Sequence, residues 1–138
     1  MNEGSELFLQ RAENELIAAQ LLFVISGDAI MQKEQFKLER EFTFYSSVIS
    51  HAYYCIFYAS KAILLTAGIM TDAPEVHKKT IDAFEMHLVR TGKLDAELLK
   101  LYREIVVRAD ELLGIFQKKK GNEEGSRIRN CHKLIEIL

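Results

Sequence analysis

The most distinctive pattern in the chain lies between residues 43 and 67, where apolar side chains cover most of a predicted helix. A single polar stripe crosses this segment at intervals of three and four residues, which places its members on one helical face. A helix this apolar is expected at the centre of a bundle, so the stripe must pair with a neighbouring helix, a partner subunit or a ligand. The polar stripe consists of Ser47, His51, Tyr54, Tyr58 and Lys61.

Apolar residues recur at helical spacing through most of the remaining chain, and no segment alternates as a strand does. In chain order, we expect helices from Ser5 to about Ile25, from residue 43 to 67, from a cap at Thr71 or Asp72 to about residue 90, from Asp95 to Phe116, and from Ser126 to Leu138. Residues 29–41 fit either a loop or a short exposed helix. The pattern predicts an all-α fold, an up-and-down bundle of four to five helices.

Composition limits the class of protein. The 138 residues suit a single domain, which we divide into a core at 5–116, a charged tether at 117–125 and a short C-terminal helix at 126–138. The net charge of −2 gives no global attraction to nucleic acid, so RNA contact would need a local basic patch. Cys55 and Cys131 form no metal-ligand spacing, and we predict neither a metal nor a cofactor. The polar stripe argues against a membrane span, and we expect a cytoplasmic protein.

Four runs of residues in the chain form a recognisable series. They are Arg11-Ala12-Glu13 with Leu16 and Ala19, Ser50-His51-Ala52-Tyr53-Tyr54, His77-Lys78, and Arg90-Thr91-Gly92-Lys93. Together they resemble the HEPN family, and most closely its small stand-alone branch, which is often encoded beside a minimal nucleotidyltransferase. The resemblance covers roughly residues 6–113 and implies a helical bundle that forms a homodimer. Some family members are metal-independent ribonucleases of toxin and antitoxin pairs, whereas others are regarded as nucleotide-binding or adaptor proteins.

The nuclease members carry an Arg followed four to six residues later by a His. Arg127 and His132 fit that spacing, with Arg suited to stabilise phosphate charge and His to move a proton without a metal. In the branch that this chain most resembles, the corresponding Arg lies near the end of the preceding helix, which matches Arg108 here. The residue five positions later is Leu113, where a nuclease would carry its His. That departure leaves Arg108 and Asp110 as groups that could bind a nucleotide phosphate or a sugar hydroxyl.

Three hypotheses follow. The first is a homodimeric binding and regulatory module, partnered with a minimal nucleotidyltransferase, in which the polar stripe faces Arg108 and Asp110 across a groove for nucleotide or RNA. The second is a metal-independent endoribonuclease toxin that uses Arg127 and His132. The third is a structural helical adaptor, whose stripe is satisfied inside the bundle or across a dimer interface. His77 is expected to make a hydrogen bond at a helix terminus.

Overall fold

The computed structural model describes residues 2–114, which form six helical segments and no strand. The expected all-α class is therefore confirmed for this part of the chain. The predicted tether at 117–125 and the predicted helix at 126–138, with Arg127 and His132, lie outside the described residues. The segments are α1 (Glu3–Ser26), α2 (Ala29–Phe36), α3 (Tyr45–Thr66), α4 (Val76–Phe84), the π-helix η1 (Glu85–Val89) and α5 (Ala96–Leu113).

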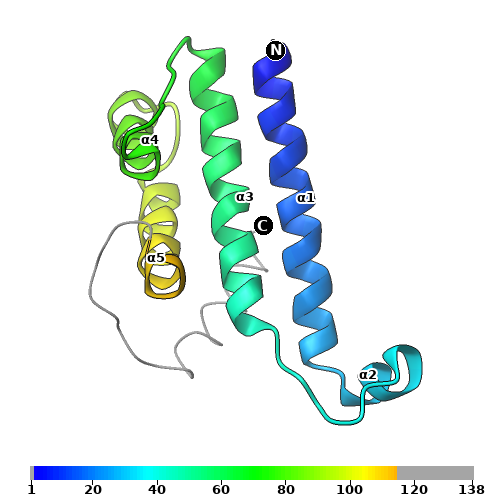
Figure 1. Ribbon diagram of the computed structural model, residues 1–138. Helices are drawn as coiled ribbons and strands as arrows, with labels where there is room; N and C mark the ends of the chain where they lie inside the picture. The colour runs from blue at the N-terminus through cyan, green and yellow to red at the C-terminus, as the bar shows by residue number, and fades with distance from the viewer. Residues whose placement is uncertain (1, 115–138) are drawn as a thin grey trace.

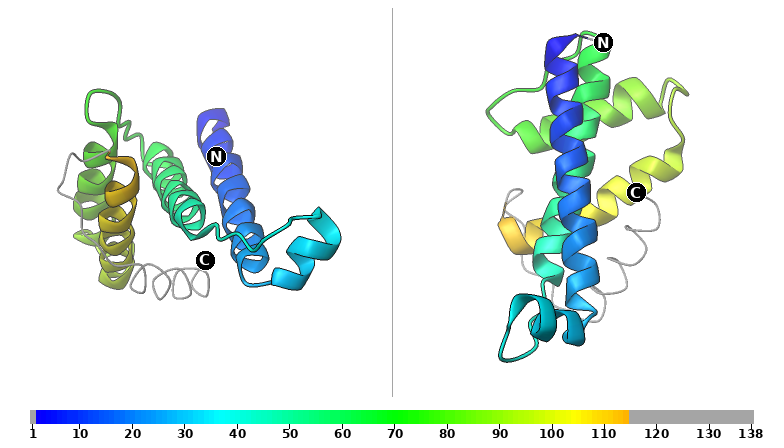
Figure 2. Two further views of the ribbon diagram at one scale, coloured as in Figure 1. Left: turned by 60° about the horizontal axis from the view of Figure 1, so that its bottom comes forward. Right: turned by 90° about the vertical axis from the view of Figure 1, so that its right-hand side faces the viewer.

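Helix α3 is the centre of the fold, as its apolar sequence predicts. Helix α1 lies beside it in the antiparallel direction, while α4, η1 and α5 lie on the opposite side of α3 (Figure 1). The pair α4 and α5 crosses α3 obliquely instead of running along it, so only α1 and α3 follow a regular up-and-down arrangement (Figure 2). Buried residues from all these elements form one core around α3, including Ile49, Tyr53, Leu64, Phe84 and Tyr102.

Small side chains let α1 and α3 approach closely. Ala12 and Ala19 are almost completely buried on α1, and they face a helix whose Ala52 is also buried. Because α1 makes most of its contacts with α3 alone, its opposite face is exposed to solvent. The inner stripe predicted for the first helix is thus correct at its two alanines, whereas Leu9, expected on the same stripe, is 38% exposed.

The segment 29–41, which the sequence left open, begins with a short helix that one buried side chain joins to the following loop. Gln32 is only 1% exposed on α2. Its amide nitrogen donates to the carbonyl oxygens of Ile25 at 2.7 Å and Phe42 at 2.9 Å, and its amide oxygen accepts from the N–H of Phe42 at 2.8 Å. Ser26 Oγ accepts from the N–H of Phe44 at 2.7 Å, which fixes the entry to α3.

Two helix starts differ from the predictions. Helix α1 begins at Glu3, because the side chain of Asn2 accepts the N–H of Ser5 at 2.8 Å and takes the capping role assigned to Ser5. Helix α4 begins only at Val76, without a side-chain cap. Thr71 is instead buried, with its hydroxyl 2.7 Å from that of Thr80. The Asp95 cap of α5 is confirmed, since its carboxylate accepts the N–H of Glu97 at 2.9 Å.

Helix α3 is also long and apolar enough to cross a membrane, by the criteria of length and composition. Among residues 2–114, it is the single helix that meets these criteria by itself. Half of its most apolar window is buried inside the bundle, as in the core helix of a soluble protein. The length and apolarity of α3 therefore have an explanation in its central position, with helices packed on two sides (Figure 1).

Candidate functional site

The polar stripe of α3 lies against α1 along much of its length. His51 pairs with Glu15 of α1, with His51 Nδ1 2.5 Å from Glu15 Oε2. One helical turn further on, burial is the main cause of a raised pKa for Tyr54, and the charge of Glu15 adds to it. Ser47, at the start of the stripe, is exposed. The middle of the stripe is therefore occupied by contacts within the bundle.

Near the N-terminal end of α1, the ring of Phe8 and the guanidinium of Arg11 contact two members of the stripe, Tyr58 and Lys61. Phe8 stacks on Tyr58 with ring centroids 6.2 Å apart. Arg11 Cζ lies 5.9 Å from the Phe8 centroid and 5.7 Å from that of Tyr58, while Lys61 Nζ lies 5.0 Å from the Phe8 centroid. These distances are typical of cation–π contacts. We call Phe8, Arg11, Tyr58 and Lys61 the cation–aromatic cluster.

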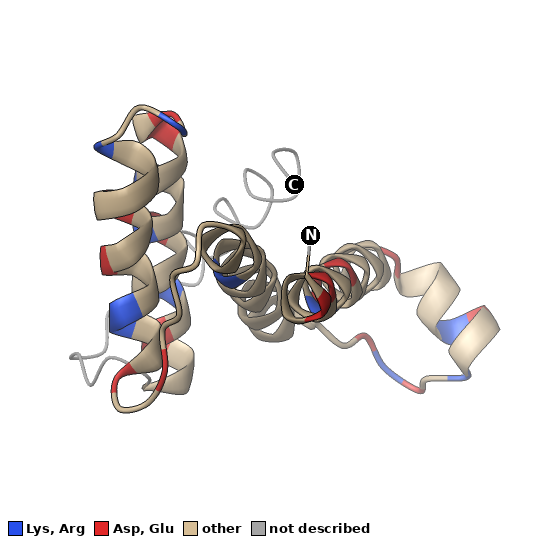
Figure 3. Cartoon of the chain, turned by 90° about the horizontal axis from the view of Figure 1, so that it is seen from above, with Lys and Arg blue, Asp and Glu red and all other residues tan. Residues whose placement is uncertain are grey.

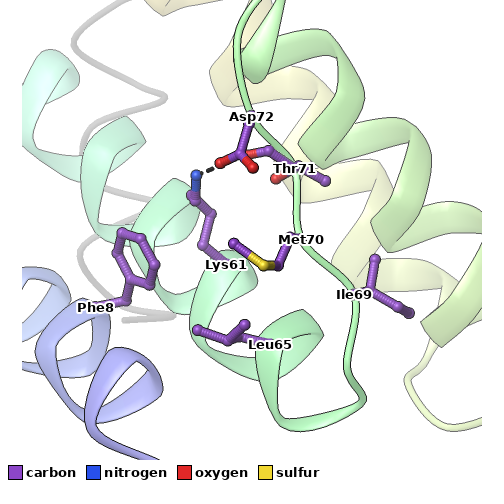
Figure 4. A pocket seen from close by; sticks show the side chains of 7 residues that line it. All are labelled: Phe8, Lys61, Leu65, Ile69, Met70, Thr71 and Asp72. Carbon is purple, nitrogen blue, oxygen red and sulfur yellow. Dashed lines mark hydrogen bonds between the residues drawn. The ribbon is translucent and has the colours of Figure 1, made fainter.

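Lys61 is held in place by the loop that follows α3. Its ammonium donates to the carbonyl oxygen of Thr71 at 2.8 Å, and its stem borders a cavity of about 60 Å³ (Figure 4). Burial lowers the pKa of Lys61; nearby Asp72 opposes that shift and Arg11 adds to it. The cavity has room for one or two water molecules and not for a nucleobase. A ligand of nucleotide size would have to lie across the surface of the cluster. The cavity is lined by Phe8, Lys61, Leu65, Ile69, Met70, Thr71 and Asp72.

His77, in the first turn of α4, extends this region. Its Nδ1 lies 2.7 Å from the hydroxyl of Tyr53, which is fully buried, and its ring lies 4.6 Å from that of Phe57. Burial lowers the pKa of His77, and the positive charge of Lys61 lowers it further. Neutral His77 can accept the phenolic proton of Tyr53 at Nδ1. Burial also raises the pKa of Tyr53 above its usual range, so the phenol stays protonated and can donate.

Arg108 and Asp110 belong to α5, on the side of α3 away from α1 (Figure 1). Arg108 Nη1 lies 3.3 Å from Glu111 Oε1, one turn along the same helix. Asp110 is 3% exposed, and its charge contributes to the raised pKa of Tyr53. Within one chain, the described contacts bring the polar stripe to α1 and bring Asp110 near the buried Tyr53. A groove that combines the stripe with Arg108 and Asp110 remains a prediction.

The sequence missed Phe8, Arg11 and Glu15 as members of the site. A signal was present, because these residues are spaced i, i+3 and i+7 and so share one side of α1. Glu15 also offers the opposite charge to a protonated histidine on the stripe. His77 was expected to make a hydrogen bond at a helix terminus, and no sequence pattern indicated that its partner would be Tyr53 of the central helix.

Metal and thiol chemistry find no support among the described residues. Between residues 2 and 114, no group of three His, Cys, Asp or Glu side chains is arranged to hold a metal ion. Cys55 is buried in α3, and burial raises the pKa of its thiol to about 11. A thiol with that pKa is protonated near neutral pH and is a poor nucleophile.

The comparisons with known proteins give one distant relative. A protein of Methanocaldococcus jannaschii, named as a putative toxin, is 36% identical to this chain over 61 residues. That match covers 44% of this chain and 40% of the relative, so the shared segment is less than half of either protein. No protein-family model and no solved structure matches the chain. Residues 2–114 thus form an all-helical fold, and the chain has a distant homologue that bears a toxin's name.

Proposed function

We propose that this protein is a helical binding and regulatory module of a toxin–antitoxin-like system, and that it binds a nucleotide or RNA at the cation–aromatic cluster. The observation that carries the proposal is the convergence of Arg11 and Lys61, from two different helices, on the same Phe8 ring. The toxin name of the archaeal relative supports the class of system. Binding at this cluster requires no metal or cofactor.

Electrostatics favour an anionic ligand at this place. Arg11 contributes to the lowered pKa of Lys61, which means that the two cations are close enough to repel each other. A phosphate group between them would replace that repulsion by two charge-assisted hydrogen bonds. The net charge of the whole chain is −2, so attraction for phosphate would come from this local pair and not from the overall charge.

The aromatic rings beside the two cations suit a nucleobase. Tyr58 stacks on Phe8 and lies 5.9 Å from the ring of Tyr54, so aromatic groups continue from the cations along α3. Stacking of a base on such rings is worth roughly 1–3 kcal/mol and depends little on which base is present. Together, the rings and cations fit a nucleotide or a short single-stranded RNA better than a free phosphate ion.

Isothermal calorimetry with ATP and with a short single-stranded RNA tests the proposal. We expect Arg11→Gln and Lys61→Met each to weaken binding about tenfold, the effect of losing one phosphate contact of roughly 1.4 kcal/mol. Lys33→Gln on α2 removes a positive charge at an exposed position and should leave affinity unchanged. Binding that survives both cluster variants but is lost in Arg108→Ala would place the site on α5 instead. An absence of heat with either ligand would favour the structural adaptor.

The partners expected from the family resemblance enter the proposal as well: a homodimer and a minimal nucleotidyltransferase protein, in the cytoplasm. Co-expression with the product of any adjacent nucleotidyltransferase gene, followed by affinity capture, tests the second partner. Capture of the full-length pair, in a stoichiometric complex, is the expected result. If no such gene lies nearby, or if the two proteins do not associate, this part of the proposal fails.

The nuclease hypothesis makes a different prediction. If Arg127 and His132 act on RNA, the full chain should degrade RNA in the presence of EDTA, and His132→Ala should stop the degradation. We expect RNA to remain intact with the wild-type protein. Degradation that depends on His132 would replace the binding module by an enzyme.

A further inference from the structure

The side of α1 that faces away from α3 is apolar over its C-terminal half. Ile17, Leu21 and Val24 follow one another at intervals of four and three residues, so they share one helical face, and they are 53%, 58% and 56% exposed. The buried Ala12 and Ala19 lie on the opposite face, which contacts α3. Single exposed apolar residues are normal on a protein surface, but three on one face form a continuous stripe that calls for a partner.

Helix α2 enlarges this surface, because it turns away from α3 at the end of α1. The chain bends by 102° between the two helices, and Figure 3 shows α2 projecting on the side of α1 opposite to α3, as Figure 1 does. Two apolar residues of α2, Ile30 and Phe36, are 70% and 54% exposed. We call the five apolar residues of the two helices the outer surface: Ile17, Leu21, Val24, Ile30 and Phe36.

The size of the outer surface suits a second copy of the chain. A large apolar side chain exposes roughly 200 Å² when it is fully accessible, so the five together expose on the order of 500–600 Å². A stable interface covers roughly 800 Å² of each subunit, and about 65% of a homodimer interface is apolar, which makes about 520 Å². The outer surface therefore provides the apolar area that such an interface needs.

Charges on the N-terminal half of α1 favour an antiparallel pair. Glu3, Glu6 and Glu13 are exposed, and their spacing places them on the same face as Ile17. In a parallel pair, these carboxylates of the two copies would lie side by side, and the repulsion between like charges would weaken the contact. In an antiparallel pair, they lie toward the end of the second copy that carries residues 29–41, where three cations balance three carboxylates.

The spacing of the stripe on α1 is self-complementary in the antiparallel orientation. Positions 17 and 24 are equally far from the midpoint between 20 and 21, so Ile17 of each copy lies opposite Val24 of the other. The two Leu21 side chains then meet beside the two-fold axis. Each of these contacts forms between identical surfaces, as the symmetry of an isologous dimer requires.

We propose that the outer surface is the interface of a homodimer, in which two copies of α1 pack antiparallel about a two-fold axis beside Leu21. The inference rests on the homodimer of the proposed function, names the surface that forms it, and is independent of ligand binding. Arg11 lies ten residues from Leu21, about 15 Å along the helix, so the two cation–aromatic clusters are about 30 Å apart. Each subunit keeps a complete cluster between its own α1 and α3, and the dimer binds one ligand per chain.

Size-exclusion chromatography with light scattering measures the mass of the full chain in solution. The wild type should give about 32 kDa, twice the 15.9 kDa of one chain. Leu21→Asp places two carboxylates together at the axis and should raise the dissociation constant of the dimer at least a hundredfold. Leu98→Asp makes the same change on α5, at a position 40% exposed, and should leave the mass at that of the dimer. Thermal melts confirm that both variants are folded.

Disulfide trapping tests the position of the axis. In a chain that carries Cys131→Ser and retains the buried Cys55, Leu21→Cys should form a disulfide between two molecules under mild oxidation, whereas Leu98→Cys should not. Equal reaction of the two variants, or no disulfide at Leu21→Cys, would overturn the antiparallel arrangement.

The outcomes separate this interface from the rest of the proposed function. A dimer that persists in Leu21→Asp would refute the outer surface as the interface and leave the homodimer intact. A monomeric wild type would refute both, and would mean that something other than a second copy covers the outer surface. Calorimetry with ATP or RNA should give the same affinity for Leu21→Asp as for the wild type, because each cluster lies within one subunit. A loss of affinity in that folded variant would contradict the proposed separation of the two sites.

Discussion

The buried side chain of Gln32 provides the sharpest test of how this fold is held together. Leucine has a similar size and, like glutamine, no branch at Cβ. Replacing Gln32 by leucine therefore removes all three hydrogen bonds of the amide with little change in volume. The N–H and the carbonyl of Phe42 then lose the partners that α2 provides. The carbonyl of Ile25 still accepts from the N–H of Asp28 at 3.2 Å, so the loss falls mainly on Phe42.

The expected magnitude follows from those two backbone groups. A buried polar group left without a partner costs about 1–3 kcal/mol, which gives roughly 2–6 kcal/mol for the pair. Phe42 is only half-buried, so water can reach part of its peptide and the lower end of that range applies. We therefore expect Gln32→Leu to lower the free energy of unfolding by about 2–3 kcal/mol, a large part of the 5–15 kcal/mol typical of a folded domain.

Urea unfolding followed by circular dichroism measures this difference, and differential scanning calorimetry should show a lower melting temperature. Gln35→Leu is the matched control, since it makes the same change on the same helix at an exposed position. The control should change stability by less than about 0.5 kcal/mol. A loss below 1 kcal/mol in Gln32→Leu, or equal effects of the two substitutions, would refute the role assigned to this side chain.

Three further substitutions, one on α4 and two on α1, examine the contacts of these helices with α3. In His77→Gln, the acid sensitivity of folding should decrease. The pKa of His77 is lowered in the folded protein, so the neutral form that accepts from Tyr53 is favoured, and wild-type stability falls as pH drops below about 6.5. Unfolding at pH 7.5 and 5.5 gives the comparison, and an unchanged pH dependence contradicts it. Ala19→Leu should cost about 3 kcal/mol in chemical denaturation, because Ala19 is fully buried and the larger side chain would be overpacked. A neutral result there would mean that the two helices can separate. Glu15→Gln should cost less than about 1 kcal/mol, since its pair with His51 is partly exposed, and a much larger loss would mark that pair as essential.

Local rules in the sequence determined most of the secondary structure. Apolar spacing identified α3 as the central helix, and Asp95 was recognised as a cap because its side chain acts on the next turn of backbone. These signals depend on residues a few positions apart, so no knowledge of the fold is needed to read them. The caps at Ser5 and Thr71 were misassigned for the same reason. Ser5 had an equally good local alternative in Asn2, which caps α1. Thr71 is buried against Thr80, a contact that only the tertiary structure decides, and α4 begins without a side-chain cap.

The partners of the polar stripe could not be derived in this way. The sequence established that His51, Tyr58 and Lys61 share one face of an apolar helix and need partners. Only the packing of α1 decided that Glu15 and the Phe8 ring would be among them, because contacts between residues 36 or 50 positions apart depend on how two helices lie side by side. The sequence thus determined which side chains would be together on each helix. The tertiary structure decided which helix each set would meet, and so where two cations come to share one aromatic ring.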